Sequence, residues 1–183
     1  MGSDLDQLLL LKRFLDDLFL IFQGTSKQLH NLLDEINKIH PAIQFTMSHT
    51  TNEQEDEADR CDCSAKESIS FLDTSCSIKN KKIKIDLFCK ACDRNQYLLP
   101  SSIHPITVTN NIPFSLGLRI VRTCTEEEDR NKRILELKQM LLSREYPERL
   151  IDNALQRALN IPRKLALKGS QKKKEIKKDQ YLW

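Results

Sequence analysis

Two adjacent aspartates, Asp16 and Asp17, interrupt a long apolar run near the start of this 183-residue chain. Apolar residues fill positions 8–11 before the pair and 18–22 after it. Burying two neighbouring carboxylates in such a run is costly, because an unpaired buried charge loses its hydration. A tight turn avoids that cost, so the run predicts a β-hairpin with strands at 9–15 and 18–22 and its turn at Asp16–Asp17. Two carboxylates at one turn favour Mg²⁺, which prefers oxygen ligands.

The rest of the N-terminal half predicts one helix and further strands. Ser26 is a favoured N-cap, and leucine and isoleucine at helical spacing predict a helix that runs to about Ile39. Alternating apolar and polar residues predict a strand at 43–47 and two paired strands at 68–78 and 82–90, joined by a turn at Asn80–Lys81. Between them, the acidic segment 49–66 lacks apolar periodicity and predicts a surface loop.

The C-terminal half predicts helices. Pro100, Pro105 and Pro113 first predict a segment that wraps the surface. Beyond them, apolar spacing predicts a short helix at 115–122, a second helix capped by Thr125 and a third whose first turn contains Pro147. Because a tight turn joins the last two helices, they form a helix-turn-helix in the topological sense.

These elements predict an α+β fold: a partial antiparallel sheet with one packing helix, then an all-α helix-turn-helix-like region and a basic tail. The expected domains are 1–98 and 99–160, with the tail at 161–183. The net charge is only +3, but residues 53–67 are acidic and residues 163–178 are basic. The basic segment favours a nucleic-acid partner, with Arg163, Lys164 and Lys168 as candidate contacts; the alternative is a solvated lysine-rich tail.

The sequence predicts no membrane segment and a reducing compartment. No apolar run is long enough to span a bilayer, and the acidic start is unlike a signal peptide. Six cysteines without such a signal predict free thiols and an intracellular location. Three of them are expected to be small buried residues: Cys76, Cys89 and Cys124. An alternative zinc set would join Cys61 and Cys63 to Cys89 and Cys92, although a one-residue spacer is poor zinc geometry.

A series of short motifs follows in a fixed order along the chain. They are Arg13–Phe19, Ile69–Thr74, Tyr97–Leu98, Ser102–Pro105, Ile112–Ser115 with Arg119 and Arg122, and Arg144–Pro147. Over about residues 9–160, this series resembles the C-terminal half of the reverse transcriptase of Penelope-like retroelements. The resemblance implies that the Asp16–Asp17 hairpin belongs to a polymerase palm and that the helices after Ser115 form its thumb, a part similar to a helix-turn-helix domain.

The resemblance also implies an RNA-directed DNA polymerase that uses two divalent metals. The residue matching Asp16 would ligate Mg²⁺ directly, and the residue matching Asp17 would assist at the metal site. The palm needs a further carboxylate from a strand that would precede Met1, so we expect a truncated copy that binds Mg²⁺ weakly and does not polymerise alone. The missing strands would leave an open sheet edge through which chains associate. The alternative for Asp16 and Asp17 is a simple acidic turn.

A retroelement role implies a nuclear location and an RNA/DNA primer-template as partner. Arg119 and Arg122 lie one helical turn apart, so both could reach backbone phosphates. Alternatively, they pair with the acidic residues at 126–129. A second hypothesis for the whole chain is a non-catalytic nucleic-acid-binding module, built on the helices from Ser115 to Asn160 and the basic tail.

Overall fold

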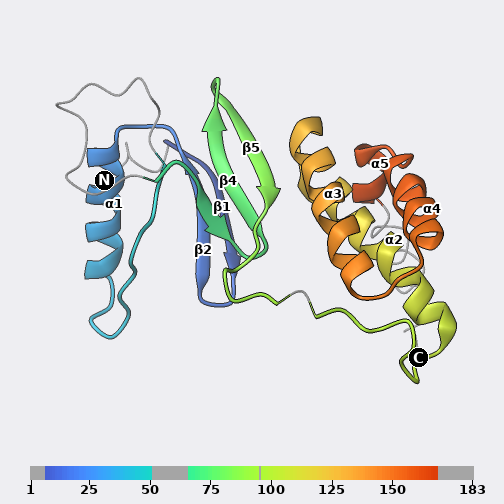
Figure 1. The fold of residues 1–183 in the computed structure, drawn as a ribbon. Coiled ribbons are helices and arrows are strands. Elements are labelled where there is room, and N and C mark those ends of the chain that lie inside the picture. The colour runs from blue at the N-terminus through green and yellow to red at the C-terminus, as the bar shows by residue number, and fades with distance from the viewer. Residues whose placement is uncertain (1–6, 51–65, 95, 169–183) are drawn as a thin grey trace, which may run out of the picture. The chain divides into compact units, whose positions relative to one another are not determined.

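The computed structural model describes residues 7–50, 66–94 and 96–168. They form two compact units, divided between Ile83 and Lys84 (Figure 1). The fold is α+β, as predicted, with small antiparallel sheets first and a helical region after them. The elements are β1 (Leu8–Phe14), β2 (Asp17–Phe22), α1 (Ser26–Lys38), β3 (Ile69–Phe71), β4 (Thr74–Lys79), β5 (Lys82–Leu87), α2 (Ile106–Thr123), α3 (Glu127–Ser143), α4 (Glu148–Leu159) and α5 (Arg163–Lys168). The units therefore divide within β5, earlier than the domain boundary expected at residue 98.

The predicted hairpin forms from β1 and β2, but its turn lies one residue earlier than expected. Phe14 pairs with Asp17, so the loop consists of Leu15 and Asp16, and Asp17 begins β2. Leu15 has a positive φ of 54° and is exposed. Positive φ at the first loop residue matches the twist of the two strands, and this geometry sets the turn more strongly than the turn preference of aspartate.

The segment predicted as one strand at 68–78 is itself a hairpin. Phe71 pairs with Thr74, so Leu72 and Asp73 form the loop between β3 and β4, and Leu72 has a φ of 55°. The sequence Phe-Leu-Asp thus occurs at the loop of both hairpins, each time with an exposed leucine at positive φ. The single-strand prediction is wrong because Leu72 lies in the loop, exposed and at positive φ, and not among core residues of a strand.

β5 completes the second sheet. It follows the predicted turn at Asn80–Lys81, where both residues have positive φ, as a type I′ turn requires. The order of this sheet is β3-β4-β5, and β1-β2 is a separate two-stranded sheet, so two small sheets stand where one partial sheet was predicted. Within the first unit, the rings of Phe19 and Phe71 bring the two hairpins together, with centroids 5.1 Å apart.

The predicted helix after the first hairpin is α1, but Thr25 caps it instead of Ser26. The Thr25 hydroxyl accepts a hydrogen bond from the Gln28 N–H, and the Gln28 side chain accepts one from the Thr25 N–H, which is a capping box. The strand predicted at 43–47 does not form. The Asn37 side chain instead satisfies both the N–H and the carbonyl of Phe45, so this backbone needs no partner strand there.

The first unit packs loosely. The apolar face of α1 is only half-buried, and it lines a cavity of about 250 Å³ together with β2, β4 and residues 45–50. The acidic loop expected at 49–66 lies mostly outside the described residues, although its ends meet through a hydrogen bond from the Lys66 N–H to the His49 carbonyl. The main hydrophobic core lies in the second unit.

α2 is much longer than the helix predicted at 115–122, because it begins at Ile106 and continues through Pro113. Proline inside a helix removes one hydrogen bond and crowds the preceding turn, at a cost of about 3 kcal/mol. Pro113 is fully buried, so its packing offsets that cost. The predicted surface-wrapping segment is therefore wrong from residue 106 onward.

Cysteine placement bears on the zinc alternative. Cys76 and Cys124 are buried, as predicted, but Cys89 is exposed because β5 ends before it. Cys92 is also exposed, and Cys61 and Cys63 lie outside the described residues. Where the structure describes the chain, no group of three or more His, Cys, Asp or Glu side chains is arranged to hold a metal ion. Likewise, no helix in the described ranges has both the length and the apolarity to cross a membrane.

Candidate nucleic-acid interface

Three helices of the second unit, α2, α3 and α4, pack around one core. Eight buried side chains form it: Ile120, Cys124, Ile134, Leu137, Leu141, Tyr146, Ile151 and Leu155. Apolar spacing predicts an inward face on this third helix, made of Leu150, Ile151, Ala154, Leu155 and Ala158. Four of these residues of α4 are buried, and Leu150 is partly buried against the core. Burial of this face fixes which side of α4 remains in contact with solvent.

α2 and α4 approach closely at Gly117. A Cβ atom at this position would lie 3.0 Å from Leu155 Cδ2 and 3.1 Å from Ala158 Cβ. From the sequence, Gly117 only weakens its helix. In the structure, the absent side chain allows the two helices to cross at short range.

The turn between α3 and α4 ends α3 with a Schellman motif. The Tyr146 N–H donates to the Leu141 carbonyl, and the Glu145 N–H donates to the Leu142 carbonyl. Glu145 has a φ of 64°, at the position where helices usually place glycine. Because glutamate stands there, the sequence lacks the usual signal for this turn.

The same turn holds the extended segment before α2. Arg144 Nε and one terminal nitrogen both donate to the Tyr97 carbonyl, at 3.0 and 2.7 Å, and the Tyr146 hydroxyl donates to the Leu98 carbonyl at 2.8 Å. Burial raises the pKa of the Tyr146 hydroxyl, which stays protonated as a donor. Two motifs far apart in the sequence, Tyr97–Leu98 and Arg144–Pro147, are thereby joined.

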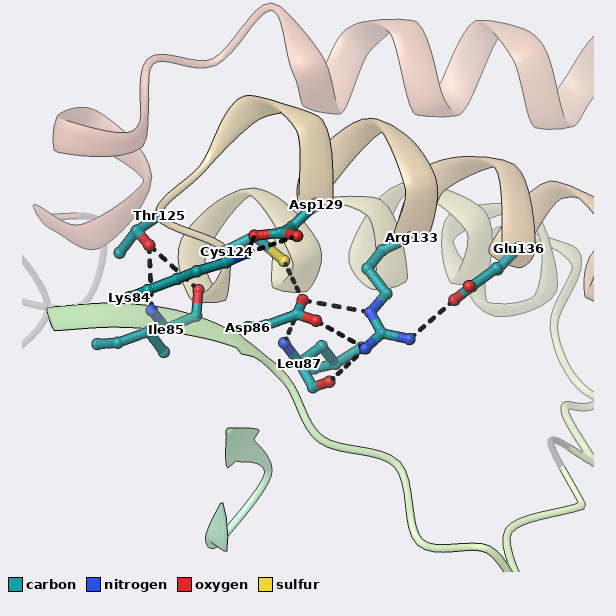
Figure 2. Close-up of polar contacts among 9 residues, drawn as sticks. All are labelled: Lys84, Ile85, Asp86, Leu87, Cys124, Thr125, Asp129, Arg133 and Glu136. Carbon is teal, nitrogen blue, oxygen red and sulfur yellow. Dashed lines mark hydrogen bonds and ion pairs between the residues drawn. The ribbon is translucent and has the colours of Figure 1, made fainter. Parts of the chain in front are cut away.

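A second network attaches the end of β5 to α3, as Figure 2 shows. Arg133 binds both carboxylate oxygens of Asp86, at 3.2 and 2.7 Å, and also donates to the Leu87 carbonyl. Burial raises the pKa of Asp86, but hydrogen bonds from Arg133 and from the Leu87 N–H lower it more, so the net shift is downward. The carboxylate therefore remains charged and the link persists at neutral pH.

Thr125 takes part in the same attachment instead of capping α3. Its hydroxyl accepts a hydrogen bond from the Ile85 N–H at 3.1 Å and donates to the Ile85 carbonyl at 3.3 Å (Figure 2). The N-cap of α3 is Glu126, which makes no side-chain capping bond. The capping prediction for Thr125 was wrong because the hydroxyl serves the backbone of a strand far away in the sequence.

The candidate phosphate-binding residues have different surroundings. Arg122 Nε donates to the Ala166 carbonyl at 2.9 Å, and Arg163 Nε donates to the Arg122 carbonyl at 3.1 Å. These two arginines thus hold α5 against the end of α2. Lys164 and Lys168 are exposed one turn apart on α5, whereas Arg119 is exposed on α2.

The sequence prediction missed the solvent face of α4. Arg149, Asn153 and Gln156 are exposed there, at spacings of four and three residues. Such spacing places them in one stripe, opposite the buried face. The signal was present in the sequence, because the polar stripe is the complement of the apolar positions that predicted the helix.

Asp16 and Asp17 lie in the first unit and are both exposed, Asp16 in the loop of the β1–β2 hairpin and Asp17 at the start of β2. A cavity of about 160 Å³ is lined by Asp17, Leu18 and Phe19 of β2, by Ser48, and by residues 69–72. These two aspartates could contribute carboxylate oxygens to a cation, but the described residues supply no third ligand from the set that binds metals.

Comparisons with known proteins identify one region of the chain. No curated protein and no solved structure matches the chain. None of the comparisons identifies a reverse transcriptase. Residues 96–156 match the family model of the animal helix-turn-helix domain. This range contains Tyr97 and Leu98, α2, α3 and most of α4. The helix-turn-helix expected from the sequence is thus supported for this region, which is similar to animal helix-turn-helix domains.

Proposed function

We propose that the second unit binds double-stranded DNA, with the α3–turn–α4 segment docked on the duplex. The observation that carries this proposal is the exposed face of α4, which lies on a helix held rigidly by the core, within a region similar to a helix-turn-helix domain. In DNA-binding helix-turn-helix proteins, the second helix of the motif enters the major groove. A rigid helix with a polar outer face suits that role.

Backbone phosphates would supply most of the affinity. Lys164 and Lys168 point to one side of α5, and Arg119 adds a third exposed cation on α2. Arg122 and Arg163 donate the hydrogen bonds of the α2–α5 contact from their Nε atoms. The terminal guanidinium nitrogens take no part in those two hydrogen bonds. Each cation that neutralises a phosphate releases a counterion, so binding weakens as salt rises.

The test is fluorescence anisotropy of the full chain with a labelled mixed-sequence DNA duplex over a salt series. We expect the logarithm of the association constant to fall linearly with the logarithm of salt concentration. Removing one phosphate contact, by Lys164→Ala or Lys168→Ala, should reduce the slope by about 0.9. Lys27→Ala removes the same charge from the first unit and should leave the slope unchanged.

Absence of duplex binding at low salt would reject the proposal. A parallel series with an RNA–DNA hybrid of the same sequence separates duplex DNA from an RNA/DNA primer-template. Preference for DNA supports major-groove docking, because the A-form groove of RNA-containing helices is deep and narrow.

The polymerase-palm origin is a second candidate function. The observation that favours it is the hairpin that exposes Asp16 and Asp17, in contact with a second hairpin through Phe19 and Phe71. We expect the chain alone to bind Mn²⁺, a spectroscopic probe for Mg²⁺, weakly, and to form no template-dependent product. Metal binding that is unchanged in the Asp16→Asn, Asp17→Asn double variant would reject the metal site. Template-dependent synthesis abolished by Asp16→Ala would instead show that the chain is an active polymerase.

A further inference from the structure

We infer that Arg149, Asn153 and Gln156 on α4 determine a base-sequence preference, with guanine at one end of the contacted site and adenine further along. The inference rests on the proposed DNA binding, but it goes beyond it by naming the residues that read bases and the bases they select. The exposed positions of these three side chains and their chemistry carry the argument.

The three side chains form one outward stripe. They are exposed on the side of α4 opposite its four buried residues, which are Ile151, Ala154, Leu155 and Ala158. Asn160, the C-cap of α4, continues the same stripe. A helix that faces DNA with this side presents one arginine and three amides and places no apolar residue of its core there.

The carboxylates of α4 are directed away from the stripe. Both acidic residues of this helix, Glu148 and Asp152, pair with Lys138 of α3, at 3.0 and 2.7 Å. Hydrogen bonds that Lys138 donates to Asp152, and then to Glu148, raise the pKa of Lys138, so its charge is retained. The charge of Lys138 offsets one of the two negative charges, which weakens the repulsion that phosphates beside the stripe would meet.

The second arginine of α4 is also separate from the stripe. The guanidinium carbon of Arg157 lies 4.8 Å from the centroid of the Phe114 ring, so this side chain extends along α2. Such a cation–π contact holds Arg157 against the protein surface. Arg149 is therefore the cation of the stripe itself.

The chemistry of the stripe matches base edges in the major groove. Arginine donates two hydrogen bonds to O6 and N7 of guanine, and asparagine or glutamine exchanges two with N6 and N7 of adenine. Gln156 donates one N–H to the Asn160 side chain at 3.4 Å. That bond leaves its second N–H and its carbonyl oxygen, the pair that adenine requires, so Asn160 positions the Gln156 amide.

The length of the stripe sets the size of the site. From Arg149 to Gln156, α4 rises about 10 Å, at about 1.5 Å per residue. Base pairs follow at about 3.4 Å, so the three side chains span about three base-pair steps. The guanine is expected at the end that faces the start of α4, and adenine toward its end.

The test selects preferred sites from a randomised DNA duplex library with the full chain. Sequencing should return a short motif with one guanine and at least one adenine. Arg149→Lys keeps the charge but lacks the bidentate fork, so it should remove the guanine preference, by about 5- to 150-fold, without changing the salt slope. Gln156→Ala should remove an adenine preference by a similar factor and leave the guanine in place. Gln139→Ala, which changes an exposed residue on α3, should return the wild-type motif.

The outcomes separate this inference from the proposal beneath it. Duplex binding without an enriched motif overturns the inference and leaves DNA binding intact. An enriched motif that survives both Arg149→Lys and Gln156→Ala also overturns it, because other residues must then read the bases. No binding at low salt rejects DNA binding and the base preference together. Unchanged circular dichroism of each variant confirms that these exposed substitutions leave the fold intact.

Discussion

Gly117 offers the most direct test of how the second unit is packed. A methyl group added there would lie 3.0 Å from Leu155 Cδ2 and 3.1 Å from Ala158 Cβ. Favourable contacts between carbon atoms lie at about 3.5–4.0 Å, so the new group is too close on two sides. Leu155 can shift only within a packed core, and the Ala158 Cβ is fixed to its backbone.

Two opposing effects determine the stability of Gly117→Ala. Alanine gains about 1 kcal/mol over glycine inside a helix. Overpacking of a tight contact costs about 1–3 kcal/mol. We therefore expect a net loss of up to about 2 kcal/mol for alanine. Valine adds two further methyl groups at the same crossing and should lose about 3 kcal/mol or more.

Amide hydrogen exchange of α2 and α4, followed by NMR, measures this loss within the second unit alone. Ala158→Gly removes one of the two crowded neighbours, so the double variant should recover at least about 0.5 kcal/mol relative to additivity. Asn110→Ala, exposed on the same helix, controls for helix propensity and should be neutral or slightly stabilising. A gain of about 1 kcal/mol for Gly117→Ala, or the absence of coupling to Ala158→Gly, would refute the close-crossing argument.

Three further predictions concern contacts and backbone geometry within the second unit. Arg133→Met should cost about 1–2 kcal/mol at neutral pH, because it leaves the partly buried Asp86 carboxylate without its main partner. Because the pKa of Asp86 is lowered in the folded state, its ion pair stabilises the fold above the unfolded pKa, and this stabilisation is lost as pH falls below about 4. In urea unfolding, Arg133→Met should therefore lose less free energy of unfolding on acidification than wild type. Burial and the hydrogen bond to Asp86 raise the pKa of the Cys124 thiol to about 11. Iodoacetamide should therefore label exposed Cys89 quickly and Cys124 only after unfolding, as measured by peptide mass spectrometry. Equal labelling rates would contradict the burial of Cys124. Glu145→Gly should stabilise the unit by about 0.5–1 kcal/mol, because glycine tolerates the left-handed backbone, and a loss in thermal unfolding would argue against this turn geometry.

Local patterns were sufficient to predict several elements. The apolar run around Asp16 predicted a hairpin within one residue of its observed turn, and spacing in α4 predicted its buried face. Both depend on neighbours within a few residues, which a sequence shows directly. The same periodicity implies the exposed stripe of α4. The sequence prediction placed the nucleic-acid contacts on the basic tail and on the arginines of α2 instead.

The remaining features depended on contacts that local sequence does not contain. α2 continues through Pro113, and Thr125 binds the backbone of β5, because distant packing partners outweigh local propensity. Asp86 and Arg133 lie 47 residues apart, and nothing in either neighbourhood indicates that they pair.

The α+β order of elements and the amphipathic faces of the helices follow from short-range periodicity, which the sequence shows directly. Which polar residues face solvent together depends on contacts made in the folded chain. Arg122 and Arg163 brace α5, Glu148 and Asp152 turn toward Lys138, and Arg149, Asn153 and Gln156 remain outward. A charged side chain forms a hydrogen bond or ion pair only with partners that folding brings close to it. Position in the chain alone does not specify those partners.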